Sequence, residues 1–128
     1  MIPARVDVTH RPGSGPGATV VRIGGTLEAD NVDAARKDIE PVVEAAPKVV
    51  VFDLGELVFL SSLGIGLLLD TRKRLTDRGT TVFLTNLQPQ IAKVMDIVNS
   101  LPRTAIFKNL AEMDSYLTEI QRRVREDE

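Results

Sequence analysis

Cysteine and tryptophan are absent from this chain of 128 residues, and histidine and tyrosine each occur once. Without cysteine there is no disulfide, no thiolate nucleophile and no thiolate metal site. His10 has no second histidine to complete a metal site or a catalytic pair, so we interpret it as a surface residue. No acid–base pair or activated nucleophile stands out. The sequence therefore predicts a protein that is not an enzyme and needs neither a metal nor another cofactor.

A charge of one sign and a long apolar run are also missing. The 16 basic and 18 acidic residues are mixed along the chain, so no charged field should attract nucleic acid. The longest apolar stretch, residues 57–69, is interrupted by serine and glycine and is shorter than the roughly 18 residues of a membrane helix. Nothing at the start of the chain resembles a signal peptide. We expect a cytoplasmic protein with no membrane insertion and no direct nucleic-acid contact.

The opening segments predict a β-hairpin. Residues 5–9 and 18–23 are β-type runs, and between them lies a loop rich in glycine and proline. Gly24-Gly25 should end the second strand. Gly13, Gly15 and Gly17 could suggest a phosphate loop, but such a loop needs a helix directly after it, and a strand follows here.

A helix and a central strand should follow the hairpin. Apolar residues recur at three- and four-residue steps from Val32, and Pro41 should kink or stop this helix near Glu40. The continuous apolar run 48–54 is typical of a central strand covered on both faces. Three carboxylates gather around the helix start, where the helix dipole favours negative charge: Glu28, Asp30 and Asp33.

The second half alternates helices and strands. In order, it predicts a helix over 62–78 closed by Gly79, a strand over 81–85, a helix from Pro89, a short strand over 104–107 and a last amphipathic helix from Leu110 that frays into a charged tail, 122–128. Together the elements predict an α/β fold: one domain, 1–128, with a mixed sheet, an opening hairpin and about four packed helices. The basic run 72–74 lies within a helix, so we interpret it as a solvated face.

Two serines, Ser61 and Ser62, lie between a strand exit and a helix start. Serine is a favoured helix N-cap, so a plain cap is one interpretation. Leu60, Leu63 and Ile65 lie off the main buried stripe of the helix, so this end carries extra apolar surface. Either a neighbouring helix covers this surface or a partner docks on it.

The same turn carries two glycines, Gly64 and Gly66. Each weakens a helix by about 1 kcal/mol relative to alanine. Their presence suggests that another backbone comes close at this point.

Several segments resemble one family. They are Gly25-Thr26-Leu27-Glu28, residues 49–54, residues 58–65 and residues 73–79. Together they are similar to the STAS domain of bacterial anti-sigma factor antagonists, and the likeness covers about residues 18–120. Its most specific part is a strand, an acidic-Ser-Ser/Thr-Gly-Leu motif and a helix.

The resemblance implies a protein-binding switch. Family members bind an anti-sigma factor that is also a serine kinase of the histidine-kinase-like ATPase type, and phosphorylation of the motif's first serine ends the binding; a serine phosphatase is the expected counterpart. Aligned on Gly64, the acceptor falls on Ser62, with Ser61 as second choice. The family's acidic residue falls on Ser61 and its second hydroxyl on Leu63. The implied partner-binding residues are Leu60, Ser61, Ser62, Leu63, Gly64, Ile65 and Glu28.

A second hypothesis stays open because Ser61 replaces the acidic residue. The chain could be a STAS subunit of a larger complex, such as a lipid-transport assembly or a stress-signalling scaffold. In that case Ser61 and Ser62 would form a permanent contact without phosphorylation switching.

Overall fold

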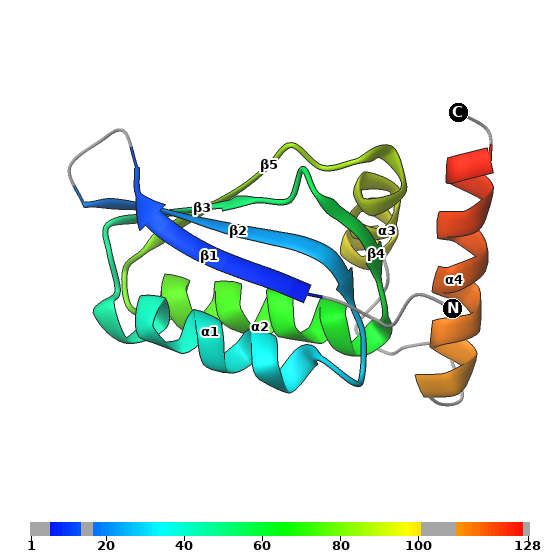
Figure 1. Ribbon diagram of the computed structural model, residues 1–128, viewed down its shortest axis with the longest axis horizontal. Helices are drawn as coiled ribbons and strands as arrows, with labels where there is room; N and C mark the ends of the chain where they lie inside the picture. The colour runs from blue at the N-terminus through cyan, green and yellow to red at the C-terminus, as the bar shows by residue number, and fades with distance from the viewer. Residues whose placement is uncertain (1–5, 14–16, 101–109, 127–128) are drawn as a thin grey trace.

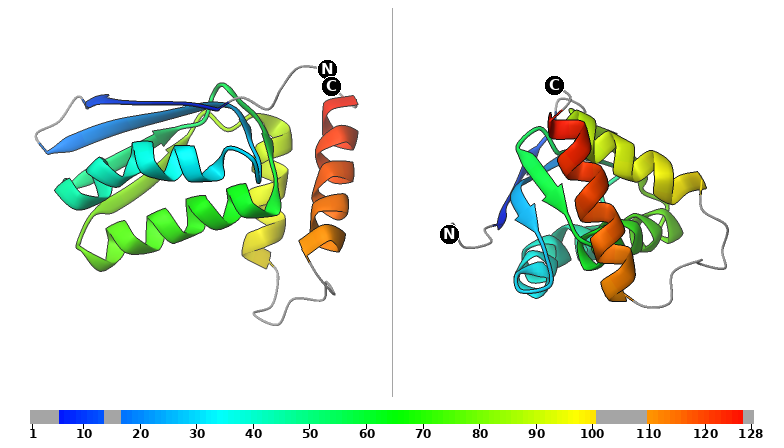
Figure 2. Two further views of the ribbon diagram at one scale, coloured as in Figure 1. Left: turned by 60° about the horizontal axis from the view of Figure 1, so that its bottom comes forward. Right: turned by 90° about the vertical axis from the view of Figure 1, so that its right-hand side faces the viewer.

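The structure is a computed structural model that describes residues 6–13, 17–100 and 110–126. The described elements, shown in Figure 1, are β1 (Val6–Pro12), β2 (Ala18–Leu27), α1 (Val32–Ala45), β3 (Val49–Asp53), β4 (Leu57–Leu60), α2 (Ser62–Asp77), β5 (Thr81–Thr85), α3 (Pro89–Ser100) and α4 (Leu110–Glu126). Helices α1 and α2 lie side by side on one face of the sheet, while α3 and α4 stand at the end of the sheet where β4 lies (Figures 1 and 2). The mixed α/β class predicted from the sequence is confirmed.

Strand β2 organises the sheet, whose order is β1-β2-β3-β5 with β4 paired to β2. It runs antiparallel to β1, as the predicted hairpin requires, and parallel to β3 and then to β4. The prediction that Gly24-Gly25 ends this strand is wrong. The pairing shifts register between Gly25 and Thr26, and Gly25 has a φ of 87°. Glycine tolerates that backbone, so β2 changes partner and continues to Leu27.

Helix α1 continues past Pro41 to Ala45, so it does not stop near Glu40, which was one of the two predicted effects of this proline. Proline removes one backbone hydrogen bond, but Pro41 lies on the exposed side of the helix. Ile39, Val42 and Val43 are buried on the opposite side. This apolar contact with the sheet outweighs the lost hydrogen bond, and the helix ends only at Ala46, whose φ is 44°.

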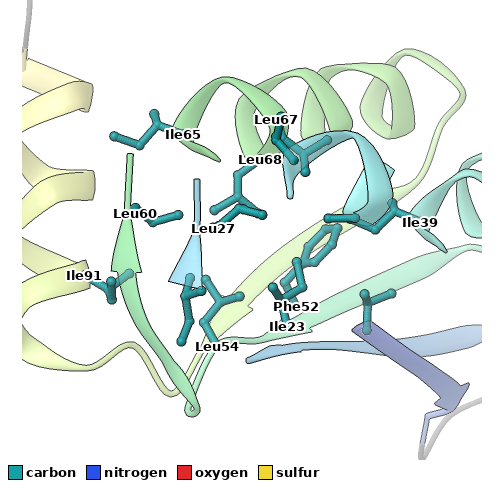
Figure 3. Close-up of a cluster of buried hydrophobic side chains, with 14 of the residues drawn as sticks. Ile23, Leu27, Ile39, Phe52, Leu54, Leu60, Ile65, Leu67, Leu68 and Ile91 are labelled. Atoms are coloured by element: carbon teal, nitrogen blue, oxygen red, sulfur yellow. The ribbon is translucent and has the colours of Figure 1, made fainter. Parts of the chain in front are cut away.

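Strand β3 is central, as predicted, because it pairs with β2 on one edge and β5 on the other. Its burial alternates, with Val50 and Phe52 fully buried and Val49 and Val51 only half-buried. The helices therefore cover one face of the strand, and the other face is only half-buried, so the expectation of cover on both faces is wrong. Figure 3 shows Phe52 and Ile23 among the buried side chains beneath the helices.

The remaining predicted elements are confirmed in part. Strand β5 and the helix starting at Pro89 are confirmed, and α2 ends one residue early, just before Arg78 and Gly79. The predicted strand over 104–107 lies outside the described residues. Fraying from Arg122 is wrong, because α4 continues to Glu126 and Arg122 pairs with Glu119 and Glu126.

Two residues of the basic run on α2, Lys73 and Arg74, form ion pairs, which agrees with a solvated face. Arg74 donates two hydrogen bonds to Glu40 of α1, at 2.7 and 2.8 Å, and Lys73 pairs with Asp77 within α2. The hydrogen bonds from Arg74 lower the pKa of Glu40. His10 is exposed on β1.

Candidate functional site at the start of α2

Ser61 performs the capping that the sequence allowed for. Its backbone is extended, with φ −86° and ψ 175°, and its Oγ accepts a hydrogen bond from the Gly64 N–H at 3.2 Å. Its own N–H donates to the Leu27 carbonyl at the end of β2. Ser61 is thus the N-cap of α2, and it ties the helix start to the sheet.

Ser62 differs from its neighbour because its hydroxyl does not hold the fold together. Its side chain is 7% exposed, yet among the described residues its Oγ has no hydrogen-bond partner. A buried polar group without a partner costs about 1–3 kcal/mol of stability, and such groups are uncommon in folded proteins. The backbone N–H of Ser62 donates a hydrogen bond to the Asp114 Oδ1 atom at 2.7 Å.

Asp114 comes from α4, far along the chain, and places a carboxylate at the positive end of α2. The first turn of α2 has no acidic residue of its own. The free N–H groups and the dipole of a helix start favour an anion at this position. Asp114 therefore supplies through tertiary contact the negative charge that the local sequence lacks.

Two glutamines complete the outer edge of β4. Gln121 of α4 accepts a hydrogen bond from the Leu60 N–H at 2.9 Å and donates to the Leu60 carbonyl at 2.7 Å. Gln90 of α3 donates to the Val58 carbonyl at 3.0 Å. Both glutamines are 1% exposed. Their amides replace the strand that would otherwise pair with this edge, and they fix α3 and α4 beside the serines.

The two glycines of the first turns have different roles. A Cβ on Gly64 would lie 2.5 Å from the Leu27 carbonyl oxygen, so the predicted close backbone approach is confirmed there. A Cβ on Gly66 would meet nothing within 4 Å, so the same prediction is wrong for Gly66. Gly66 is exposed one turn after Leu63, on the same side of the helix.

The apolar residues of the candidate partner surface also differ from one another, because two are buried and one is exposed. Leu60 and Ile65 are 0% and 2% exposed, and Figure 3 shows both in the buried cluster with Leu27. For these two side chains, cover by neighbouring elements explains the extra apolar surface. Leu63 is 40% exposed.

Glu28 is half-buried just beyond β2. Its carbonyl accepts the N–H groups of Asn31 and Val32, and in return Asn31 Oδ1 accepts the Glu28 N–H. Glu28 thus forms the turn into α1 beside Leu27, to which Ser61 is bonded. Asp33 lies in the first turn of α1, where its charge is favoured.

Sequence reasoning missed Asp114, Gln121 and Gln90, the side chains that bring α3 and α4 to the serines. A signal existed on α4, because Asp114, Leu117 and Gln121 follow at three- and four-residue steps and share one helix face. A carboxylate and an amide beside a buried leucine were polar groups on the inner face. Their partners, however, are backbone atoms more than fifty residues away, which no local pattern identifies.

No cluster of three or more metal-ligating side chains occurs within 6–13, 17–100 and 110–126. Among the helices of these same ranges, none has the length and apolarity to cross a membrane.

The family model that describes the STAS domain matches residues 6–113 of this chain. The chain therefore belongs to the STAS domain family.

Solved structures of similar fold include anti-sigma factor antagonists. One from Mycobacterium paratuberculosis has 21% identity and a TM-score of 0.64, with 97% of each chain covered. The phosphorylated Bacillus cell fate determinant SpoIIAA has 22% identity and a TM-score of 0.57, over 73% of this chain and 83% of that one. A variant of Moorella thermoacetica RsbS has 19% identity and a TM-score of 0.56, over 93% and 99%. Among curated proteins, no sequence matches significantly.

Proposed function

We propose that this protein is a non-catalytic anti-sigma factor antagonist that acts in the cytoplasm by partner switching. The unmodified chain binds an anti-sigma factor that is also a serine kinase of the histidine-kinase-like ATPase type. Phosphorylation of Ser62 ends that binding, and a serine phosphatase restores it. Several solved structures of this fold are named as anti-sigma factor antagonists, which supports the proposal.

One observation carries the choice of Ser62. Ser61 and Ser62 lie at the same helix start, but Ser61 Oγ caps the helix and Ser62 Oγ has no hydrogen-bond partner among the described residues. Modifying Ser61 would remove the cap. Modifying Ser62 leaves the cap in place, so the folded domain can carry the phosphate.

Electrostatics explain how a phosphate there would change binding. It adds about −1.5 to −2 charges at neutral pH. The domain tolerates this charge at the N-terminus of α2, where backbone N–H groups favour anions. A partner packed against the exposed Leu63 side chain would instead have to bury an unpaired anion beside an apolar contact, which costs several kcal/mol.

The proposal is tested by Ser62→Asp and Ser62→Ala. Each is used as bait on extracts of the native organism, and captured ATPases are identified by mass spectrometry and purified for binding measurements. We expect the unmodified chain and Ser62→Ala to bind the same kinase, Ser62→Asp to bind at least about tenfold more weakly, and all three to fold. Equal binding by Ser62→Asp would show that Ser62 takes no part in switching.

Two features favour the permanent-subunit hypothesis: the burial of Ser62 and the absence of an acidic residue at position 61. Under that hypothesis the chain would copurify with a stable complex in which Ser62 is never phosphorylated. The same capture experiment separates the two, because a stable complex would survive both substitutions and addition of ATP.

A further inference from the structure

Ser62 is buried in this structure, at the point where α4 contacts the start of α2. Its side chain is 7% exposed, and its backbone N–H is bonded to Asp114 of α4. A kinase must reach the hydroxyl oxygen to transfer a phosphoryl group to it. In the arrangement described, Ser62 is therefore not a substrate.

Helix α4 is held at this end of α2 by bonds from its polar side chains to backbone groups and by packing against α3 and β4. Asp114 binds the Ser62 N–H, Gln121 binds both backbone groups of Leu60, and Leu117 lies between them in the core. These three residues are the inner face of two helical turns. On the described part of α4, Leu117 and Gln121 are the fully buried side chains.

The fit of α4 against β4 is also incomplete. A groove of about 440 Å³ lies beside them, lined by Phe59 of β4 and by Thr118, Gln121, Arg122, Arg125 and Glu126 of α4. Figure 2 shows α4 at the outside of the molecule, in front of β4. Elements with few buried apolar contacts open more readily than the core does.

A phosphate on Ser62 and a seated Asp114 exclude one another. Both are anions that would occupy the same helix start, and the Asp114 carboxylate already takes the Ser62 N–H. Two negative charges within a few ångströms in a poorly hydrated site repel strongly. Either the phosphate or α4 can hold the N-terminus of α2.

We propose that α4 is a lid whose Asp114 carboxylate occupies the position of the phosphate. With the lid seated, Ser62 is protected from modification. When the lid opens, Ser62 becomes accessible, and phosphorylation then keeps the lid from closing. The lid itself is independent of any partner, while its role in controlling phosphorylation rests on the function proposed above.

The absence of cysteine makes the lid directly measurable. Ser62→Cys gives the chain a single thiol at the covered position, and 5,5′-dithiobis(2-nitrobenzoate) reports how fast that thiol becomes accessible. In this background Asp114→Ala should raise the reaction rate by about tenfold or more, because a charged hydrogen bond is lost. Asp114→Asn keeps an acceptor without the charge and should give an intermediate rate.

Glu119→Gln is the matched control, because Glu119 is a carboxylate of α4 whose ion pairs stay within that helix. It should leave the thiol rate within about twofold. If the rate in the Ser62→Cys chain equals that of a free thiol, or is the same for every residue at position 114, α4 is not a lid.

Two further measurements keep the result decisive. Lid opening exposes less surface than global unfolding, so the thiol rate should depend on urea concentration more weakly than global unfolding does; an equally steep dependence would contradict a local lid. Ser62→Asp in the cysteine-free chain should speed deuterium uptake over residues 110–126, and unchanged uptake would contradict the mutual exclusion. Neither experiment uses a kinase, so failure here leaves the proposed phosphorylation standing, and failure to find phosphate leaves the lid standing.

Discussion

Helix α2 meets α1 along its length and α4 at its first turn, and the two contacts consist of different interactions. Along α1, buried aliphatic side chains face one another, and two ion pairs, Arg36–Asp70 and Arg74–Glu40, join the exposed rims. At α4, polar side chains bind backbone atoms: Asp114 binds Ser62 of α2, and Gln121 binds Leu60 of β4, the strand that leads into α2. The contact with α1 is an extended apolar one, whereas α4 adds hydrogen bonds to backbone groups beside the buried side chain of Leu117.

We expect the apolar contact with α1 to hold the fold together and the contact with α4 to be the one that can open. Aliphatic burial is spread over many side chains, so losing one leaves the others in place. Hydrogen bonds to buried backbone groups are few, and breaking them exposes those groups to water, which can replace the partner. Ser62, the residue that we propose as the switch, lies at the second kind of contact.

The largest expected effect is on stability, at the start of α2, where Gly64 packs against the backbone of Leu27. Gly64→Ala should destabilise the domain by about 1–3 kcal/mol or more, because its Cβ would collide with the Leu27 carbonyl oxygen, which belongs to the backbone. Gly66→Ala is the matched control and should stabilise α2 by up to about 1 kcal/mol. Urea unfolding of both variants checks this. Equal stabilities of the two variants would contradict the different roles assigned to Gly64 and Gly66.

Gln121→Ala should cost about 1–3 kcal/mol at the α4 contact, since it leaves the Leu60 N–H and carbonyl without their partner. Hydrogen exchange should show the loss first over β4 and α4. At the α1 contact, Glu40→Gln should change stability little, because an ion pair between half-exposed side chains is largely offset by solvent. A greater loss from Glu40→Gln than from Gln121→Ala would reverse the comparison.

Leu63→Ser tests the exposed side of the first turn. Leu63 is 40% exposed, so the melting temperature should barely change, whereas binding to the captured kinase should weaken by about 1 kcal/mol. A large fall in melting temperature with unchanged affinity would place Leu63 in the core and remove it from the partner surface.

The smallest effect concerns pH and the carboxyl end of β3. Asp53 accepts hydrogen bonds from the Gly55 N–H, from Asn86 and from Arg22, and these hold its pKa below the ordinary value of about 3.9. A lowered pKa gives stability that is present above pH 4 and is lost as the pH falls through the folded-state value. Asp53→Asn should therefore be less stable than the parent at pH 7 and nearly equal to it near pH 2; a gap that persists at pH 2 would exclude this origin.

The sequence predicted the elements whose signals are local. The hairpin, the strand over 81–85 and the buried stripe of α2 follow from alternation and three-to-four spacing, and all are present. The predicted ends of α1 and β2 were wrong because tertiary contacts outweighed the local preference of proline and glycine. Pro41 is tolerated because neighbouring apolar residues are buried, and Gly25 allows β2 to exchange β3 for β4.

The candidate site could be predicted only in part. A serine at a strand exit predicts an N-cap, and Ser61 is that cap. Which serine is left without a partner depends on where α4 lies, since Asp114 takes the Ser62 N–H and contributes nothing to the hydroxyl. That information is in a contact between residues 52 positions apart, and no spacing rule reaches so far.

The most direct test of the account is the position of phosphate on the native protein. The chain is isolated from its own organism, with and without incubation with the captured kinase and ATP, and the peptide containing Ser61 and Ser62 is fragmented by mass spectrometry. The account predicts phosphate on Ser62 and none on Ser61, since Ser61 Oγ caps the helix and Ser62 Oγ has no partner among the described residues. Phosphate on Ser61 alone, or on neither serine in the presence of a kinase that binds the chain, would contradict it.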